Sequence, residues 1–209
     1  MFDAGCGIGI LSLALKLLGY NVEGGDKYLF VAGTPYFCPE LPRLQTIWSQ
    51  EKLSISSKDM LTDSVEQKYD CVISIATIEH QKDTEWFIQK IIQHISSGGY
   101  LYMATPNIAH LLNRVRFLFG RSPMTHNLRD FFSAGENYTG HWREYTLKEL
   151  KSISEWSNLE IIMARNMQSA RPFRRFKNFR ELYVDFFRLL SYLIPGTKDT
   201  NLIFAKVKR

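Results

Sequence analysis

The sequence has few cysteines and no long apolar run. Cys6, Cys38 and Cys71 are spread over 209 residues without a C-x-x-C pair. This spacing argues against a disulfide framework and against a cysteine zinc site, and it fits a reducing compartment. No apolar run reaches the roughly 18–20 residues that a membrane-spanning helix needs. Because Met1 leads straight into a glycine turn without a basic leader region, we expect no signal peptide and a cytoplasmic protein.

The charge is moderate overall but unevenly placed. The chain has 45% hydrophobic and 22% charged residues, as folded globular proteins do, and its net charge is +5. From Arg165 to Arg209 eleven Lys and Arg face three acidic residues, a net charge of +8. This excess predicts either a solvated basic face or contact with phosphates on nucleic acid, a lipid surface or a substrate.

Strand and helix patterns alternate along the first half, as in a parallel sheet with crossover helices. We therefore expect an α/β fold in a single domain over 1–209. Strands are predicted at 1–3, 21–23, 52–56, 69–76, 100–104, 159–167 and 201–209, helices at 8–18 and 84–95, and a turn at 96–99. Prolines 35, 39 and 42 exclude a long regular helix within 31–45. Thr146 and Glu149 predict a capping box at the start of a helix.

Two segments interrupt this alternation. Residues 107–145 form a long connection of the kind that serves as a lid or binding loop. Residues 171–195 interleave arginines with aromatic residues. That pattern leaves four interpretations open: binding of single-stranded nucleic acid, an amphipathic element on an anionic membrane, an oligomer contact, or a helix packed on the sheet.

The chain opens with MFDAGCGIGI, a D-x-G-x-G-x-G turn formed by Asp3, Gly5, Gly7 and Gly9. A dinucleotide fingerprint starting at Gly5 needs glycine where Ile10 stands, and no P-loop lysine follows. Alternating glycines allow a ligand close to the backbone, and the following helix N-terminus favours a negative group. The plain alternative is a strand–helix turn that binds nothing.

Two acidic residues downstream favour a nucleotide-like ligand. Asp26 ends the second predicted strand, where an acidic residue meets ribose hydroxyls in nucleotide-binding α/β folds. Asp59 follows the third strand, where its carboxylate can accept from an adenine amine; its alternative role is helix capping.

Together these features resemble the class I S-adenosylmethionine-dependent methyltransferases, in particular the group that includes the ubiquinone-pathway O-methyltransferases. The residues that carry the resemblance are FDAGCGIG, VEGGDKY, SSKDM, YDCVISIATIEH, ISSGGYLYMATPN and HWREYTLKEL, in the family's order over nearly the whole chain. The resemblance implies a Rossmann-like seven-stranded sheet with flanking helices and a lid insertion at 107–145, and S-adenosyl-L-methionine as the cofactor.

The same resemblance assigns the cofactor-binding residues. It implies that the turn of Asp3, Gly5, Cys6, Gly7 and Gly9 surrounds the methionine part. Asp26 would bind the ribose, with Lys27 beside it. Asp59 and Met60 would contact adenine, and the backbone of Ile75 and Ala76 would line the amino-acid end.

Two histidines are the candidate catalytic residues, since a base near neutral pKa assists methylation of a hydroxyl. His80 follows the fourth strand in TIEH and His141 lies in GHWREY, both at the family's active-site rim. Their alternative roles are a helix cap or loop contact for Glu79–His80, and anchoring of the lid for His141 with Arg143 and Tyr145. Some ubiquinone-pathway enzymes have an E-x-x-E-H metal site, but Ala76 stands at the first glutamate, so no metal is expected.

We therefore expect a transferase that methylates an oxygen of a small-molecule, sugar-like or lipid-linked acceptor. Ile-Ala-Thr-Ile replaces the [DN]-P-P-[YF] motif of adenine and glutamine amine methylases, which disfavours nucleic acid as a partner. The basic segment at 171–195 suggests peripheral membrane contact. One alternative is a catalytically degenerate cofactor-binding module, suggested by the short first strand; another, a nicotinamide oxidoreductase, is disfavoured by Ile10 and Asp59.

Overall fold

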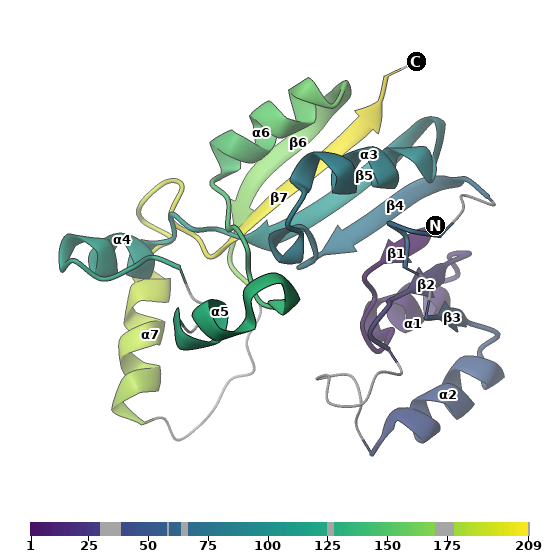
Figure 1. Ribbon diagram of the computed structural model, residues 1–209, viewed down its shortest axis with the longest axis horizontal. Helices are drawn as coiled ribbons and strands as arrows, with labels where there is room; N and C mark the ends of the chain where they lie inside the picture. The colour runs from purple at the N-terminus through teal and green to yellow at the C-terminus, as the bar shows by residue number, and fades with distance from the viewer. Residues whose placement is uncertain (30–38, 58, 64–66, 125–127, 170–177, 209) are drawn as a thin grey trace.

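The computed structural model describes residues 1–29, 39–57, 59–63, 67–124, 128–169 and 178–208. Within these ranges seven strands form one sheet in the order β3-β2-β1-β4-β5-β7-β6, as Figure 1 shows. The strands are β1 (Phe2–Ala4), β2 (Glu23–Gly25), β3 (Ser54–Ser56), β4 (Tyr69–Ile75), β5 (Ile95–Pro106), β6 (Leu159–Met167) and β7 (Thr200–Val207). β1 to β5 pair in parallel, whereas β7 is antiparallel to β5 and β6. The predicted Rossmann-like seven-stranded sheet is confirmed.

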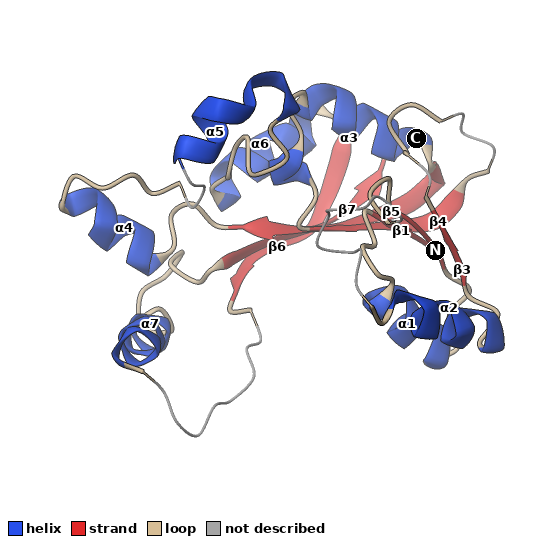
Figure 2. Cartoon of the chain, turned by 60° about the horizontal axis from the view of Figure 1, so that its bottom comes forward, coloured by secondary structure: helices blue, strands red, loops and turns tan. Residues whose placement is uncertain are grey.

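Helices cover both faces of this sheet. The described helices are α1 (Ile10–Leu17), α2 (Leu41–Gln50), α3 (Thr84–Gln93), α4 (Leu111–Leu118), α5 (Leu128–Ala134), α6 (Leu147–Trp156) and α7 (Phe179–Leu190), with 3-10 turns η1 (Ile78–His80) and η2 (Gly135–Asn137). Figure 2 shows α3 and α6 on one face of the sheet and α1 and α2 on the other. In the described residues no helix has the length and apolarity to cross a membrane.

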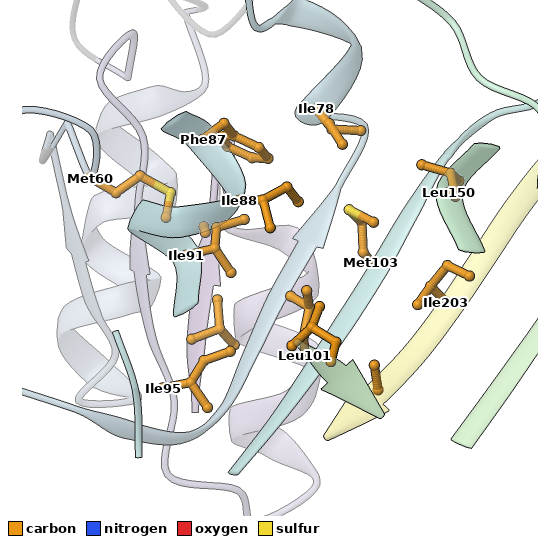
Figure 3. Close-up of a cluster of buried hydrophobic side chains, with 14 of the residues drawn as sticks. Met60, Ile78, Phe87, Ile88, Ile91, Ile95, Leu101, Met103, Leu150 and Ile203 are labelled. Carbon is orange, nitrogen blue, oxygen red and sulfur yellow. The ribbon is translucent and has the colours of Figure 1, made fainter. Parts of the chain in front are cut away.

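Each face has its own apolar core. Under α3 and α6 the buried side chains include Phe87, Ile88, Ile91 and Leu150, which Figure 3 shows gathered over β4 and β5. Under α1 and α2 a smaller cluster is formed by Val22, Leu29, Leu41, Trp48 and Leu53. The apolar stripes of these helices bury against the sheet, and this burial drives the layered packing.

The turn predicted at 96–99 needs correction. The expected turn at 96–99 lies within β5: Ile95 pairs with Tyr69 and Tyr100 with Cys71, so the extra residues form an irregularity in a continuous strand. Pairing with β4 overrides the local turn preference of the glycines, and Gly98 supplies the positive φ of 74°. In 31–45, α2 begins at Leu41 with Pro42 in its first turn, where a missing N–H costs nothing. Residues 31–38 lie outside the described ranges.

The two interrupting segments contain the remaining helices. Residues 107–145 contain α4, α5 and η2, and their ends meet in a bridge between Asn107 and Tyr145. Helix α7 lies beside α4 in Figures 1 and 2 and not against the sheet; residues 171–177 are outside the described ranges. The predicted capping box of Thr146 and Glu149 is confirmed at the start of α6.

Candidate functional site

Backbone hydrogen bonds fix the glycine turn between β1 and α1. Gly5, Gly7 and Gly9 all have left-handed φ values, of 77°, 54° and 70°. The N–H groups of Gly5 and Cys6 donate to the carbonyl of Gly25 at the end of β2, at 2.8 and 3.2 Å. The turn is thus fixed to the neighbouring strand, and its backbone path is one that only glycine adopts without strain.

A side chain at Gly5 would collide with the residue Thr77 that follows β4. A Cβ there would lie 2.6 Å from Oγ1 of Thr77, which donates to the carbonyl of Ala4 at 3.3 Å. Thr77 follows β4, so the turn packs directly against the end of that strand. The close packing of the turn on Thr77 therefore requires glycine at position 5.

Asp3 is buried at the end of β1 and faces the turn from within. Its Oδ2 accepts a 2.6 Å hydrogen bond from Oγ of Ser12 on α1. Burial raises the pKa of the Asp3 carboxyl, and the nearby Asp26 charge adds to this, while the Ser12 bond opposes it. Burial also raises the pKa of the Cys6 thiol, so Cys6 is a neutral lining side chain and not a thiolate nucleophile.

Asp26 connects the second strand to the turn. Its Oδ2 accepts from the N–H of Gly7 at 3.0 Å and its Oδ1 from the N–H of Tyr28 at 2.9 Å. Each carboxylate oxygen has a second lone pair, so these bonds orient Asp26 without excluding a ligand hydroxyl. Lys27 lies beside it, with Nζ 3.8 Å from Oδ2 of Asp59.

Asp59 and Met60, the predicted adenine contacts, lie in different surroundings. Asp59 Oδ1 accepts from the N–H of Leu61 at 3.0 Å, as a capping residue does, while its Oδ2 faces Lys27. Met60 is buried in the core under α3, as Figure 3 shows. Asp59 is therefore positioned by both a turn and an ion pair, and a contact of Met60 with adenine stays a prediction.

Ile75 and Ala76 end β4 beside the turn. Ile75 is exposed at the strand end, and Ala76 has a φ of 54°, which is unusual for a residue other than glycine. The Ala76 N–H donates to the carbonyl of Ala104 at 2.8 Å. Backbone strain of this kind often occurs at functional sites, and lining of the cofactor by Ile75 and Ala76 stays a prediction.

The two candidate catalytic histidines meet at this edge. The rings of His80 and His141 are 4.7 Å apart, edge to face. Nδ1 of His80 is 2.9 Å from the carbonyl of Thr139, and Nδ1 of His141 is 2.8 Å from Oε1 of Glu144. Because a carbonyl and a carboxylate only accept, both Nδ1 atoms donate, and Nε2 of each neutral ring carries the lone pair.

Buried carboxylates surround this pair. Glu144 is almost fully buried, and its hydrogen bond raises the pKa of His141. Glu79 is fully buried: its Oε2 accepts from Thr105 at 2.8 Å, and its Oε1 has no partner among the described residues. Burial raises the pKa of Glu79, while the charges of His80 and His141 oppose the shift.

The cluster also has the donor set of a metal site. Ligand atoms of Glu79, His80 and His141 lie within 4.8 Å of one another, and Glu144 backs one of the imidazoles as carboxylates often do behind metal-bound histidines. His141 thus stands close to the E-H pair although Ala76 replaces the first glutamate of the E-x-x-E-H motif. The expectation that no metal binds stays a prediction.

Comparison with known proteins identifies the family. Residues 1–164 match the family described as "Methyltransferase domain". The chain belongs to this methyltransferase family. It is 33% identical over 107 residues to a ubiquinone biosynthesis O-methyltransferase of Pseudomonas savastanoi pv. phaseolicola, a stretch that covers 51% of the chain and 44% of that protein. A ubiquinone biosynthesis O-methyltransferase of Rickettsia prowazekii is 28% identical over 215 residues, covering 100% of the chain and 77% of that protein.

A solved structure agrees on the fold of this methyltransferase-family chain. Magnesium protoporphyrin IX methyltransferase from Synechocystis PCC 6803, with bound S-adenosylhomocysteine, superposes with a TM-score of 0.57 at 16% identity, covering 98% of this chain and 72% of that one. Since the match to the Pseudomonas relative spans under half of that protein, the substrate of this methyltransferase domain is a matter for the proposal below.

The candidate site contains residues that sequence reasoning missed. Ser12, Thr105 and Glu144 position Asp3, Glu79 and His141 through the hydrogen bonds above. Glu144 stands three residues after His141, and this proximity in HWRE is a signal that could have paired them. Nothing local connects Thr105 to Glu79, because the contact joins β5 to the turn η1 that follows β4.

Proposed function

We propose that this protein transfers a methyl group from S-adenosylmethionine to an oxygen of a small acceptor. The observation that carries the proposal is the His141–Glu144 pair, placed with His80 at the same sheet edge as the glycine turn. The left-handed glycines of the turn and the oriented Asp26 fit the donor. The S-adenosylhomocysteine bound by the Synechocystis structure, and relatives named O-methyltransferases, support both halves.

The chemistry divides between the donor and the protein's own residues. When bound, the donor supplies an electrophilic methyl carbon, and the sulfonium–carbon bond breaks as the acceptor oxygen takes that methyl. The protein holds the acceptor oxygen in line and removes its proton, and positioning of this kind contributes strongly to rate. The proton passes from the acceptor hydroxyl to Nε2 of His141.

His141 is the better base of the two histidines. Its Nδ1–H donates to a buried carboxylate, which stabilises the imidazolium after proton transfer, whereas His80 donates to a neutral carbonyl. His80 lies edge to face with His141 and would contact the acceptor beside it. The acceptor class is a small-molecule, sugar-like or lipid-linked hydroxyl.

Calorimetric titration with S-adenosylhomocysteine, with NADH in parallel, tests the donor. We expect binding of the first and none of the second, and loss of the first in Asp26→Ala. If the protein did not bind S-adenosylhomocysteine at high micromolar concentration, the proposal would be wrong.

Transfer of a labelled methyl group to phenolic, sugar and lipid-linked hydroxyls then tests catalysis. Cofactor binding without turnover on any acceptor would favour the non-catalytic module. Because Glu79, His80 and His141 also form a metal donor set, the assay is run with and without a chelator. If the chelator abolished turnover and a divalent cation restored it, the acceptor would be activated by a metal ion at these three residues and not by a metal-free His141.

A further inference from the structure

Helix α7 exposes its apolar side. Phe179, Leu182, Tyr183, Phe186 and Leu189 recur three or four positions apart, so they share one face of the helix. Their exposed fractions run from 43% to 86%. A surface helix of a globular protein normally turns such a stripe inward, and α7 does the reverse.

Polar contacts hold α7 in this orientation. Nη2 of Arg188 donates to the carbonyl of Ser169 at 2.6 Å, and Oγ of Ser191, just after the helix, donates to Oε1 of Gln168 at 2.9 Å. Both contacts reach the chain that follows β6. The side of α7 that includes Arg188 is therefore fixed to the body of the protein, where Val184, Phe187 and Leu190 are half-buried. The stripe from Phe179 to Leu189 is presented to the surroundings.

Helix α4 extends the apolar surface. Phe117, Leu118 and Phe119, at the end of α4, are 69%, 82% and 79% exposed. Helices α4 and α7 lie side by side and project from the same end of the sheet in Figures 1 and 2. We call these exposed side chains the α4–α7 face: Phe117, Leu118, Phe119, Phe179, Leu182, Tyr183, Phe186 and Leu189. Exposed apolar side chains gathered on two neighbouring helices are typical of an interaction surface.

The charge around the α4–α7 face is positive. Along α4 and the described residues around it, 107–124, the sequence has three arginines and no acidic residue, and Lys198 follows α7. On α7 itself the acidic Asp185 is paired with Arg188. A second copy docking through the same face would bring like charges together, which disfavours a homodimer there. An anionic surface is the complementary occupant.

The face lies at the carboxyl edge of the parallel strands. Helix α4 follows Pro106 at the end of β5, and α7 lies between Met167 of β6 and Thr200 of β7. Thr200 pairs with both Pro106 and Met167, so these chain ends meet at one edge. That edge also contains Ala76 and His80, which follow β4, and His141 of the insertion, which lies against His80.

We propose that the α4–α7 face docks on the surface of an anionic lipid bilayer. The aromatic and leucine side chains enter the headgroup region, and the surrounding arginines bind lipid phosphates, as interfacial amphipathic helices do. Docking brings the candidate site to the membrane surface. The inference rests on the exposed surface alone and stands or falls independently of methyl transfer.

Co-sedimentation of the full chain with vesicles tests the inference. We expect binding to phosphatidylcholine vesicles that contain phosphatidylglycerol, little binding to phosphatidylcholine alone, and weaker binding as salt increases. The variant Phe186→Glu/Leu189→Glu should lower the partition coefficient about tenfold or more. Leu18→Glu/Trp156→Glu is the matched control, because these side chains are as exposed but belong to α1 and α6, and it should bind as the unchanged protein does.

The outcomes separate the possible occupants. The inference is overturned if both double variants lose vesicle binding equally. It is also overturned if the unchanged protein binds neutral and anionic vesicles equally. A concentration-dependent dimer, seen by sedimentation velocity, that Phe186→Glu/Leu189→Glu abolishes without any vesicle binding overturns it as well. Circular dichroism and thermal unfolding confirm that both double variants are folded; because all four side chains are exposed, we expect unchanged unfolding temperatures.

Discussion

The two halves of the candidate site are built in different ways. The donor half is a short stretch of backbone: three left-handed glycines, Asp3 at the strand end and Asp26 bonded to Gly7. The acceptor half is an assembly of side chains from distant segments, in which the 107–145 insertion brings His141 and Glu144 to Glu79 and His80.

The two halves differ in the substitutions that they tolerate. A turn that depends on φ values and close backbone contacts tolerates almost no substitution, because the added atoms have nowhere to go. A cluster joined by hydrogen bonds can lose one member and leave the fold intact, while its chemistry fails. Substitutions in the donor half should therefore affect folding and cofactor affinity, and those in the acceptor half should affect turnover.

The largest effect is expected for Gly5→Ala. The new Cβ would lie 2.6 Å from Oγ1 of Thr77 at a φ of 77°, so both the contact and the conformation are unfavourable. We expect a loss of stability on the order of 2 kcal/mol and at least about a tenfold loss of S-adenosylhomocysteine affinity. Thermal unfolding and calorimetry measure the two.

Gly19→Ala is the matched control for this substitution. Gly19 also has a positive φ, of 91°, but a Cβ there has nothing within 4 Å. It should lose stability through strain alone and keep its cofactor affinity. If Gly19→Ala weakened S-adenosylhomocysteine as much as Gly5→Ala, the close packing of the turn would not be what forms the donor half.

In the acceptor half, His141→Ala should lower kcat by about a hundredfold or more, because a positioned base contributes 10²–10⁴-fold. Its affinity for S-adenosylhomocysteine should stay within about twofold, since the histidine pair does not form the glycine turn. Methyl-transfer kinetics and calorimetry on the same preparation provide both values.

His110→Ala serves as the control for a histidine outside the cluster, at the start of α4. It should keep both kcat and affinity. A fall in cofactor affinity for His141→Ala that equals its fall in kcat would contradict the division of the site into two halves.

This division also explains what the sequence could predict. The glycine turn, Asp26 and the capping box of Thr146 are patterns within a few residues, and the structure contains the turn and the cap as expected. The parallel arrangement of the first strands was predicted from the alternation of strand and helix patterns, and the seven-stranded sheet from the resemblance to the family. The expected turn at 96–99 failed because pairing with β4, a long-range interaction, overrides the local preference of two glycines.

The acceptor half could be predicted only in part. His80 and His141 were each singled out by their motifs, but their contact could not be read from either one. Thr139, which fixes the His80 ring, is 59 positions away in sequence, and Thr105 is 26 positions from Glu79. Contacts between such distant segments depend on how the insertion returns to the sheet, which no local pattern encodes.

A smaller effect, on pH dependence, is expected for Glu144→Gln. The hydrogen bond to Glu144 raises the pKa of His141 above its ordinary value of 6.5, so the acidic limb of kcat/KM should lie above that pH. A neutral amide stabilises the imidazolium less, so the pKa falls and the limb moves to lower pH. The pH profile of kcat/KM measures the shift.

Glu149→Gln is the comparison for a carboxylate outside the histidine cluster. Its side chain pairs with Arg143 and caps α6, so its loss should leave the acidic limb in place. An unshifted limb in Glu144→Gln would mean that His141 is not the group that must lose its proton.

The smallest effect is expected for Thr146→Ala, directly after the insertion. Oγ1 of Thr146 accepts from the N–H of Glu149, and the Glu149 side chain accepts from the N–H of Thr146. Removing the hydroxyl should cost about 1 kcal/mol and lower Tm by about 2–4 °C. Thr46→Ala, in the interior of α2, removes a hydroxyl that bonds to the carbonyl of Pro42 and should change Tm less.

The same Thr146→Ala variant also tests whether the cap is linked to the candidate site. Thr146 adjoins Tyr145, whose backbone closes the insertion, so kcat is measured well below Tm. An unchanged kcat would show that the cap supports the helix alone, whereas a fall beyond that explained by unfolding would couple this local device to the acceptor half.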